Sequence, residues 1–206
     1  MHPIMEQSFA VIDSEIGTHN FNQCEYAIIR RIIHSTADFE FLDLVKFSPE
    51  AIASGTDALR RRVPIVTDVS MVKQGIGNLV AQTFNNPIIS AVEQVSSPLS
   101  GKTRTETGLI QCWQQYPEAI YAIGNAPTAL LALCNQLQST SIHPALVIGA
   151  PVGFISVLES KAALASTPVN QIRVEGRKGG SPVAAAIVNA LIVLAWGAGG
   201  AGGMEY

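Results

Sequence analysis

The chain has 206 residues, enough for one large domain with a substantial hydrophobic core, and 48% of its residues are hydrophobic while 14% are charged. Its net charge of −3 argues against general nucleic-acid binding, which needs a basic surface. The most apolar segment, 183–198, is shorter than a membrane-spanning helix and contains Asn189, so we expect a soluble protein without a membrane partner.

Cysteine usage and the N-terminal segment both predict a cytoplasmic protein. Residues 1–15 lack the positively charged start and the long apolar run of a secretory signal. Cys24, Cys112 and Cys134 lie far apart in apolar surroundings and form no C-x-x-C pair. We therefore expect reduced thiols in the core and no protein-bound metal.

The first half of the chain alternates between helical and strand-like patterns. The spacing of apolar residues predicts a helix over 20–33, and the alternation of apolar and polar residues predicts a half-buried strand over 39–47. Ser48 is expected to cap the helix that follows. Short buried strands are expected at 63–67 and 88–92.

The second half repeats this alternation. Its expected elements are, in order, a helix at 106–116, a strand at 119–123, a helix at 126–137, a strand at 145–149, a helix at 156–165, a weak strand at 171–174 and an alanine-rich helix at 182–196. Short apolar strands that alternate with helices are typical of a parallel sheet buried on both faces. The predicted fold class is therefore α/β: a single domain with a mainly parallel β-sheet covered by helices on both faces.

No internal repeat or linker divides the chain. One domain is expected over 1–196, followed by a flexible, glycine-rich tail at 197–206. In open parallel sheets, ligands bind outside the carboxyl ends of the strands. The loops that lead from strands into helices are therefore where we expect a functional site.

The loop before the last predicted helix combines glycines with two cations. It reads Gly-Arg-Lys-Gly-Gly-Ser-Pro, and its candidate anion-binding residues are Arg177, Lys178, Gly179, Gly180 and Ser181. The glycines let backbone N–H groups approach a ligand, the helix N-terminus adds positive charge, and arginine binds carboxylates through two hydrogen bonds. A plain solvated turn is the alternative interpretation.

The end of the first predicted helix is a second candidate. Arg31 and His34 are three residues apart and so share a helix face. Histidine is the side chain best suited to exchange a proton near neutral pH. Cationic side chains at a helix C-terminus also stabilise the helix dipole, and from these residues alone that role is the more economical interpretation.

Two further loops offer polar groups in front of helices. Arg104 lies in the basic, hydroxyl-rich segment 102–107, and Asn125 and Thr128 flank the start of the helix at 126–137. Both loops suit anion binding, and the first equally suits helix capping by threonine and glutamate.

Several common motifs are missing from the sequence. It contains no Walker A phosphate loop, no G-x-G-x-x-G turn, no H-E-x-x-H and no G-x-S-x-G. The residues by themselves therefore indicate an α/β protein that binds a multiply anionic small molecule. An enzyme or binding module for a nucleotide or sugar phosphate, with 176–181 as its phosphate loop, is the alternative.

The same motifs, in this order, resemble those of the precorrin-8X methylmutase family, and the resemblance extends to about Trp196. They are Ser8-Phe9, Arg31-Ile32-Ile33-His34, Thr67-Asp68-Val69-Ser70-Met71-Val72, Thr103-Arg104, 122–128 (AIGNAPT), 151–154 (PVGF), 159–161 (ESK) and 176–181 (GRKGGS). The glycine-rich tail belongs to no motif of the family.

The resemblance implies an isomerase of cobalamin (vitamin B12) biosynthesis. Such an enzyme moves a methyl group from C-11 to C-12 of an anionic tetrapyrrole, without a cofactor, and cobalt is present only where the substrate carries it. The product is hydrogenobyrinic acid or, with cobalt, cobyrinic acid. By analogy, His34 is the proton donor and acceptor, and Ser8 and Arg31 contact the substrate. Because Arg31 lies beside His34, we hypothesise that binding of a substrate carboxylate helps to protonate the histidine.

The resemblance also implies a homodimer with the substrate near the subunit interface. Hand-over of the product to the next enzyme of the pathway is a further expectation. A carrier that retains the product and passes it on, without catalysing the methyl shift, is the alternative role within the family.

Overall fold

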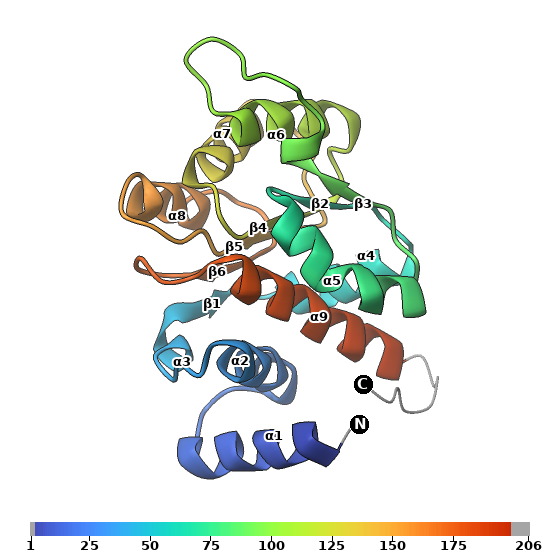
Figure 1. The fold of residues 1–206 in the computed structure, drawn as a ribbon, viewed down its shortest axis with the longest axis vertical. Helices are drawn as coiled ribbons and strands as arrows, with labels where there is room; N and C mark the ends of the chain where they lie inside the picture. Colours follow the sequence, from blue (N-terminus) through green and yellow to red (C-terminus); the bar gives the residue numbers. More distant parts are fainter. Residues whose placement is uncertain (1–2, 199–206) are drawn as a thin grey trace.

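Six strands form the central sheet (Figure 1). The computed structural model describes residues 3–198. The strands are β1 (Val45–Phe47), β2 (Ile65–Thr67), β3 (Ile88–Ser90), β4 (Ile120–Ile123), β5 (Leu146–Gly149) and β6 (Gln171–Val174). They lie in the order β1-β6-β5-β4-β2-β3, and every neighbouring pair is parallel except β1 and β6. The predicted mainly parallel sheet is confirmed, with one antiparallel strand at its edge.

Helices cover both faces of the sheet, as predicted (Figure 1). One face carries α2 (Gln23–Thr36), α4 (Ala51–Arg60), α5 (Ser70–Gln82) and α9 (Ser181–Gly197), with α1 (Pro3–Ile16) packed against α2. The other face carries α6 (Arg104–Gln115), α7 (Pro127–Leu137) and α8 (Val157–Ala165). Two one-turn helices, α3 (Phe41–Leu44) and η1 (Ala91–Glu93), lie in the connections.

The strands divide their side chains between two hydrophobic cores. In β4, Ile120 and Ala122 enter the core that contains α9, whereas Tyr121 and Ile123 enter the core that contains α6 and α7. Because both faces of the sheet are buried at its centre, the strands β4 and β5 are apolar throughout instead of alternating. Short, fully apolar segments are therefore the signal that these two strands leave in the sequence, whereas β6 also contains Gln171 and Arg173.

The alanine-rich helix α9 packs against α2, α4 and α5 and is buried along most of its length. Small side chains let its neighbours approach closely. A Cβ atom on Gly75 of α5 would lie 2.8 Å from the Cβ atom of Ala185, and one on Gly124 would lie 2.9 Å from that of Ala184. These contacts hold the start of α9 against the loop that follows β4.

Two local predictions at the sheet edge are wrong in whole or in part. The strand predicted over 39–47 is confirmed only at 45–47 (β1), because the residues before it form the helical turn α3. The carboxylate of Asp38 accepts a hydrogen bond from the backbone N–H of Glu40 (3.0 Å) and so favours a turn there. Ser48 does not cap α4, because its hydroxyl accepts a hydrogen bond from the backbone N–H of Gln171 (2.9 Å) and ties the sheet edge instead.

The sequence patterns did not predict α1 or α5. The interior of α5 contains Gly75, Gly77 and Asn78, three residues of low helix propensity. Burial of its apolar side against α9 and the sheet compensates for this propensity.

The last helix ends at Gly197, one residue beyond the predicted domain boundary. Most of the predicted tail, residues 199–206, lies outside the described residues. Within 3–198, no helix is both long enough and apolar enough to cross a membrane.

Candidate active site

The loops at the carboxyl ends of the parallel strands lie along one edge of the sheet. The chain passes from β2 to β3 on one side, then returns to the other side of β2 for β4, β5 and β6. Such a reversal of strand order is where open α/β sheets bind ligands. The predicted site residues at 104, 125, 128 and 177–181 all belong to loops or helix N-termini at this edge.

Asp68 joins the loops that follow β2 and β4. It is fully buried, and its carboxylate accepts hydrogen bonds from the backbone N–H groups of Val69 (3.0 Å), Gly124 (3.1 Å), Asn125 (2.6 Å) and Ala126 (2.7 Å). Burial raises the pKa of the Asp68 carboxyl, and the four N–H groups act in the opposite direction by stabilising the carboxylate. Asp68 therefore determines the position of the loop between β4 and α7.

Hydroxyl groups link the N-termini of α6 and α7. The Oγ1 atoms of Thr103 and Thr128 lie 3.0 Å apart, at hydrogen-bonding distance. Thr103 also forms a capping box with Glu106, so the capping interpretation of this segment is confirmed. The exposed side chain of Asn125 makes no hydrogen bond to any residue of 3–198.

Arg104 begins α6 and is exposed at the same edge. Its Nε donates a hydrogen bond to the carbonyl oxygen of Val95 (2.9 Å). The two terminal guanidinium nitrogens have no partner among the described residues. The interaction with Val95 therefore orients the side chain and leaves its outer nitrogens available to a carboxylate.

A buried lysine holds the loop between β6 and α9. Lys161 of α8 is 4% exposed, and its ammonium donates hydrogen bonds to the carbonyl oxygens of Gly176 (2.7 Å) and Lys178 (2.7 Å). Burial lowers the pKa of Lys161 to about 8. No carboxylate among the described residues pairs with this ammonium, so its partners are two main-chain carbonyls.

These two hydrogen bonds fix the direction in which two backbone N–H groups of the loop point. In a trans peptide, a carbonyl and the N–H that follows it point in opposite directions. The N–H groups of Arg177 and Gly179 therefore point away from Lys161, and neither has an acceptor among residues 3–198. Together with the exposed guanidinium of Arg177, they form a group of hydrogen-bond donors at the start of α9 whose chemistry suits an anion, and we call it the α9 nest.

The other predicted residues of this loop have structural partners. The ammonium of Lys178 forms ion pairs with Asp38 (2.6 Å) and Glu40 (2.9 Å), so it ties the loop to the α2–α3 connection instead of standing as a free cation. The N–H of Gly180 donates to the carbonyl oxygen of Ala150 (2.8 Å).

Gly179 and Ser181 complete the loop. A Cβ atom on Gly179 would overlap the carbonyl oxygen of Ala150, and its φ of +152° also favours glycine. Ser181 is the first residue of α9 and is buried. The predicted need for glycine in this loop therefore has a specific steric cause.

His34 lies in the last turn of α2, beside α1. Its exposed imidazole stands edge-on to the ring of Phe9, with ring centroids 5.1 Å apart, and neither ring nitrogen is hydrogen-bonded to a described residue. Arg31, one turn earlier, lines a cavity of about 70 Å³ together with Phe9 and residues of α9. Ser8 precedes Phe9, and its hydroxyl donates to the carbonyl oxygen of Ile4 (2.9 Å). The structure thus brings Arg31 and His34 of α2 to the side chain of Phe9, and Ser8 lies next to Phe9 in α1.

An ion pair connects this group of residues to the α9 nest. Asp38 follows the end of α2 by two residues and pairs with Lys178 of the β6–α9 loop. The hydrogen bond from Lys178 lowers the pKa of Asp38. The end of α2 that carries His34 is therefore attached directly to the predicted anion-binding loop.

Residue types alone did not single out Asp68 or Lys161. The available signals were weak: a lone aspartate directly after the apolar strand at 63–67, and a lysine inside the mostly apolar helix at 156–165. Within the described part of the chain, no group of three or more His, Cys, Asp or Glu side chains is placed to hold a metal ion. The edge thus offers cations, free N–H groups and an imidazole, which suit carboxylate binding and proton exchange.

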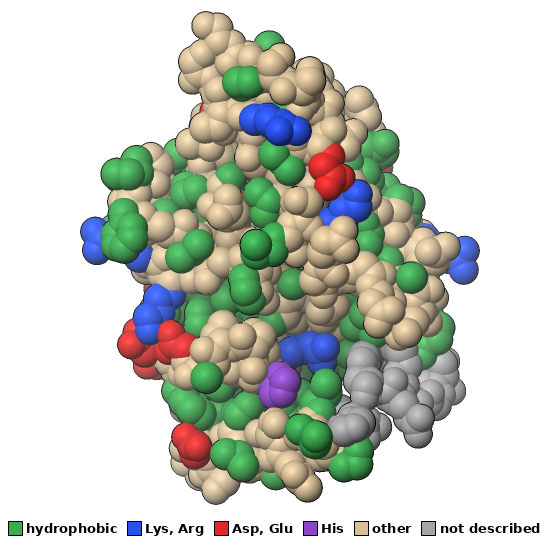
Figure 2. Space-filling view, viewed as in Figure 1, with side chains coloured by type: hydrophobic (Ala, Val, Ile, Leu, Met, Phe, Trp, Pro, Cys, Tyr) green, Lys and Arg blue, Asp and Glu red, His purple; other side chains and the backbone are tan. Residues whose placement is uncertain are grey.

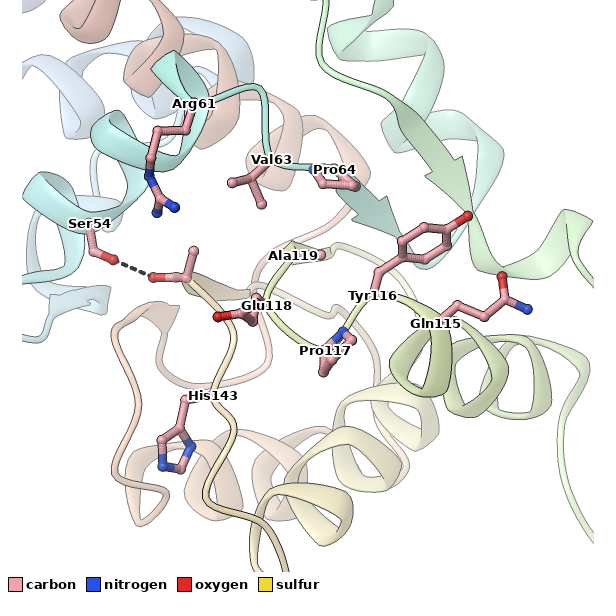
Figure 3. Close-up of a pocket in the computed structure, with 11 residues that line it drawn as sticks. Ser54, Arg61, Val63, Pro64, Gln115, Tyr116, Pro117, Glu118, Ala119 and His143 are labelled. Atoms are coloured by element: carbon pink, nitrogen blue, oxygen red, sulfur yellow. Dashed lines mark hydrogen bonds between the residues drawn. The ribbon is translucent and has the colours of Figure 1, made fainter.

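A separate hollow of about 330 Å³ lies at the opposite edge, near the amino ends of β2, β4 and β5 (Figure 3). Arg61 reaches toward it from α4, and Glu118 and His143 line it from other segments. Arg61 is already paired with Asp57 (2.8 Å). Because none of the predicted site residues lines this hollow, the candidate active site is the carboxyl edge.

The fold and this edge define a class of protein: an α/β protein with cations and free N–H groups at the carboxyl edge of its sheet and an exposed histidine on a helix attached to that edge. A sequence model of the precorrin-8X methylmutases matches residues 3–194. The chain belongs to the precorrin-8X methylmutase family, whose members are isomerases of cobalamin biosynthesis.

Individual relatives agree with this assignment over nearly the whole chain. The chain is 57% identical to a cobalt-precorrin-8 methylmutase of Synechocystis sp., over 95% of this chain and 96% of that protein. It is 36% identical to a precorrin-8X methylmutase of Sinorhizobium sp., over 91% and 92% respectively. A solved structure of the precorrin-8X methylmutase from Thermus thermophilus superposes with a TM-score of 0.90 at 39% identity, covering 97% of this chain and 98% of that one. The predicted family and fold are confirmed.

Proposed function

We propose that the chain moves a methyl group from C-11 to C-12 of precorrin-8 or its cobalt form, and so produces hydrogenobyrinic acid or cobyrinic acid. Membership of the methylmutase family supports the type of reaction. The reaction is an intramolecular rearrangement, so it needs no external methyl donor. The protein has to hold the ring in one tautomer and supply a proton where charge develops.

His34 is the proposed proton donor and acceptor. The observation that carries this assignment is that its imidazole is exposed near the end of α2, which the Asp38–Lys178 ion pair attaches to the carboxyl edge, with both ring nitrogens free of partners among the described residues. The contact with Phe9 restrains the ring without using either nitrogen. A ring nitrogen of the substrate that approaches this side chain can therefore gain or lose a proton through it.

The substrate carboxylates have several proposed partners at the same edge. The α9 nest offers two N–H groups and the Arg177 guanidinium, while Arg104, Asn125 and Thr128 offer side-chain donors on the other loops. Arg31 and Ser8 are proposed to contact the substrate beside His34. These donors are spread over separate loops, as expected for a ring with acetate and propionate groups around its rim.

The cobalt-containing substrate is the favoured one. The identity of 57% to a cobalt-precorrin-8 methylmutase is higher than the 36% to a relative named for precorrin-8X. Cobalt would be bound by the macrocycle itself, so this proposal requires no metal ligand from the protein. We further propose that the protein is a cytoplasmic homodimer and that it hands its product to the next enzyme of the pathway.

An anaerobic assay with purified protein tests the function. Precorrin-8X and its cobalt form are supplied separately, and the visible spectrum is followed with time. Conversion to a corrin spectrum supports the mutase, and the faster substrate identifies the metallation state. Tight binding of hydrogenobyrinic acid without any conversion would instead support a carrier. If the protein neither bound nor converted the macrocycle, both the mutase role and the carrier role would be refuted.

A further inference from the structure

Two large apolar side chains stand in solvent on the loop between β5 and α8. Phe154 is 86% exposed and Ile155 is 82% exposed, more than any other large hydrophobic residue within 3–198. Val152 and Leu158, on either side of them, are also exposed. We call these four residues the β5–α8 apolar patch. Figure 2 shows hydrophobic side chains on the surface in the region of α8, with Lys or Arg side chains beside them.

The backbone conformation of the loop holds the side chains of Phe154 and Ile155 in solvent. Gly153 before the pair has a φ of +143°, and Ser156 after it has a φ of +57°, a left-handed conformation that serine rarely adopts. Val157, the next residue, is buried, so the start of α8 is anchored while the tip of the loop is not. Strained loops that hold large apolar side chains in water are typical of binding segments.

The patch adjoins the α9 nest. The N–H of Gly153 donates to the carbonyl oxygen of Arg177 (3.4 Å), and the N–H of Gly180 donates to that of Ala150 (2.8 Å). These two hydrogen bonds join the β5–α8 loop to the β6–α9 loop. Among the described residues, no carboxylate pairs with the guanidinium of Arg177. An apolar surface and an unpaired cation therefore lie side by side at the carboxyl edge.

We propose that Phe154 and Ile155 form the surface on which one face of the macrocycle rests, while Arg177 binds a carboxylate on its rim. This inference rests on the proposed function. A corrin-type ring is apolar across its face and anionic around its periphery. The apolar patch is therefore complementary to the face of the ring, and the neighbouring Arg177 is complementary to the carboxylates on its rim. A second copy of the chain is a less suitable occupant, because an unpaired arginine is costly inside an apolar protein interface.

The test measures how tightly hydrogenobyrinic acid binds to three proteins. They are the wild type, the double variant Phe154→Ala/Ile155→Ala, and the control Ile142→Ala. Ile142 is also an exposed large hydrophobic residue, but it precedes β5 and so lies at the opposite edge of the sheet. Because the residues are exposed, all three proteins are expected to fold. Light scattering on the same samples reports the oligomeric state.

We expect the double variant to bind hydrogenobyrinic acid about tenfold more weakly than the wild type, with the control unchanged. Wild-type affinity in the double variant would overturn the inference and leave the proposed function intact. A weaker affinity that accompanies dissociation into monomers would also overturn it, in favour of an interface between copies. A wild type that neither binds nor converts the macrocycle would mean that the proposed function itself had failed, and the inference with it.

Discussion

The ammonium of Lys161 in α8 lies 2.7 Å from the carbonyl oxygen of Lys178, in the loop that starts α9. A second hydrogen bond of the same length joins it to the carbonyl oxygen of Gly176. Because both carbonyls face the buried ammonium, the N–H groups of Arg177 and Gly179 face the other way. A side chain buried beneath the loop thus shapes the surface that we propose binds substrate carboxylates.

Replacement of Lys161 by methionine keeps most of its volume but leaves two carbonyl groups unpaired. We expect the free energy of unfolding to fall by about 2 kcal/mol, and the affinity for hydrogenobyrinic acid to fall about fivefold. Urea unfolding and titration calorimetry measure the two effects. The control is Lys73→Met, which removes only a surface ion pair with Glu93. A folded Lys161→Met protein that binds as tightly as the wild type would show that the lysine does not shape the loop.

The lowered pKa of Lys161 predicts how stability changes with pH. It is about 8 in the folded protein, compared with the ordinary value of 10.5. Between these two values the unfolded chain binds more protons than the folded chain, so the contribution of Lys161 to stability rises with pH in this window. The wild type should therefore gain stability relative to Lys161→Met between about pH 8 and about pH 10.5 in urea unfolding. A difference that stays constant over this range would contradict the assignment.

Asparagine in place of Asp68 preserves the shape of the side chain but not its charge. An amide nitrogen cannot accept a hydrogen bond, so some of the four backbone N–H groups lose their partner. We expect a loss of about 3 kcal/mol in the free energy of unfolding. Asp57→Asn, at an exposed ion pair with Arg61, is the matched control. If the two variants unfolded at the same urea concentration, Asp68 would have no special role in holding the β4–α7 loop.

Thiol reactivity tests the placement of the three cysteines. Cys112 and Cys134 are buried in the core, as predicted, whereas the prediction was wrong for Cys24, which is exposed near the start of α2. Burial raises the pKa of Cys112 to about 11 and also raises the pKa of Cys134, so neither thiol is ionised near neutral pH. A thiol reagent at about pH 8 should label Cys24 alone in the folded protein and all three thiols after unfolding, as seen by mass spectrometry. Labelling of Cys112 in the folded protein would contradict this.

Local patterns were sufficient for most of the fold. Each strand was predicted at or near its position, and the clearest signals were the fully apolar segments 120–123 and 146–149, which are buried on both faces. The helix α5 was missed because Gly75 and Gly77 both lower its local helix propensity, and only Gly75 is required for close packing, against Ala185. The turn at α3 was missed because apolar and polar residues alternate there as they would in a strand.

The sequence was sufficient to locate the loops that carry the predicted site residues, but not the interactions within those loops. The glycine-rich loop before α9 was recognised from its composition, but the pairing of Lys178 with Asp38 joins residues 140 positions apart. The contacts of Asp68 and Lys161 are also non-local, at separations of up to 58 and 17 residues. A single sequence does not reveal which distant backbone groups such side chains will meet.

The most direct test of the proposed methyl shift concerns His34. The rate of the methyl shift is measured in single turnovers for the wild type and for His34→Asn, and the affinity of each for hydrogenobyrinic acid is measured alongside. We predict that His34→Asn loses at least about 100-fold in rate, while its affinity changes little, because proton transfer is lost and the binding loops are untouched. A variant that catalyses the shift at the wild-type rate would contradict the role of His34.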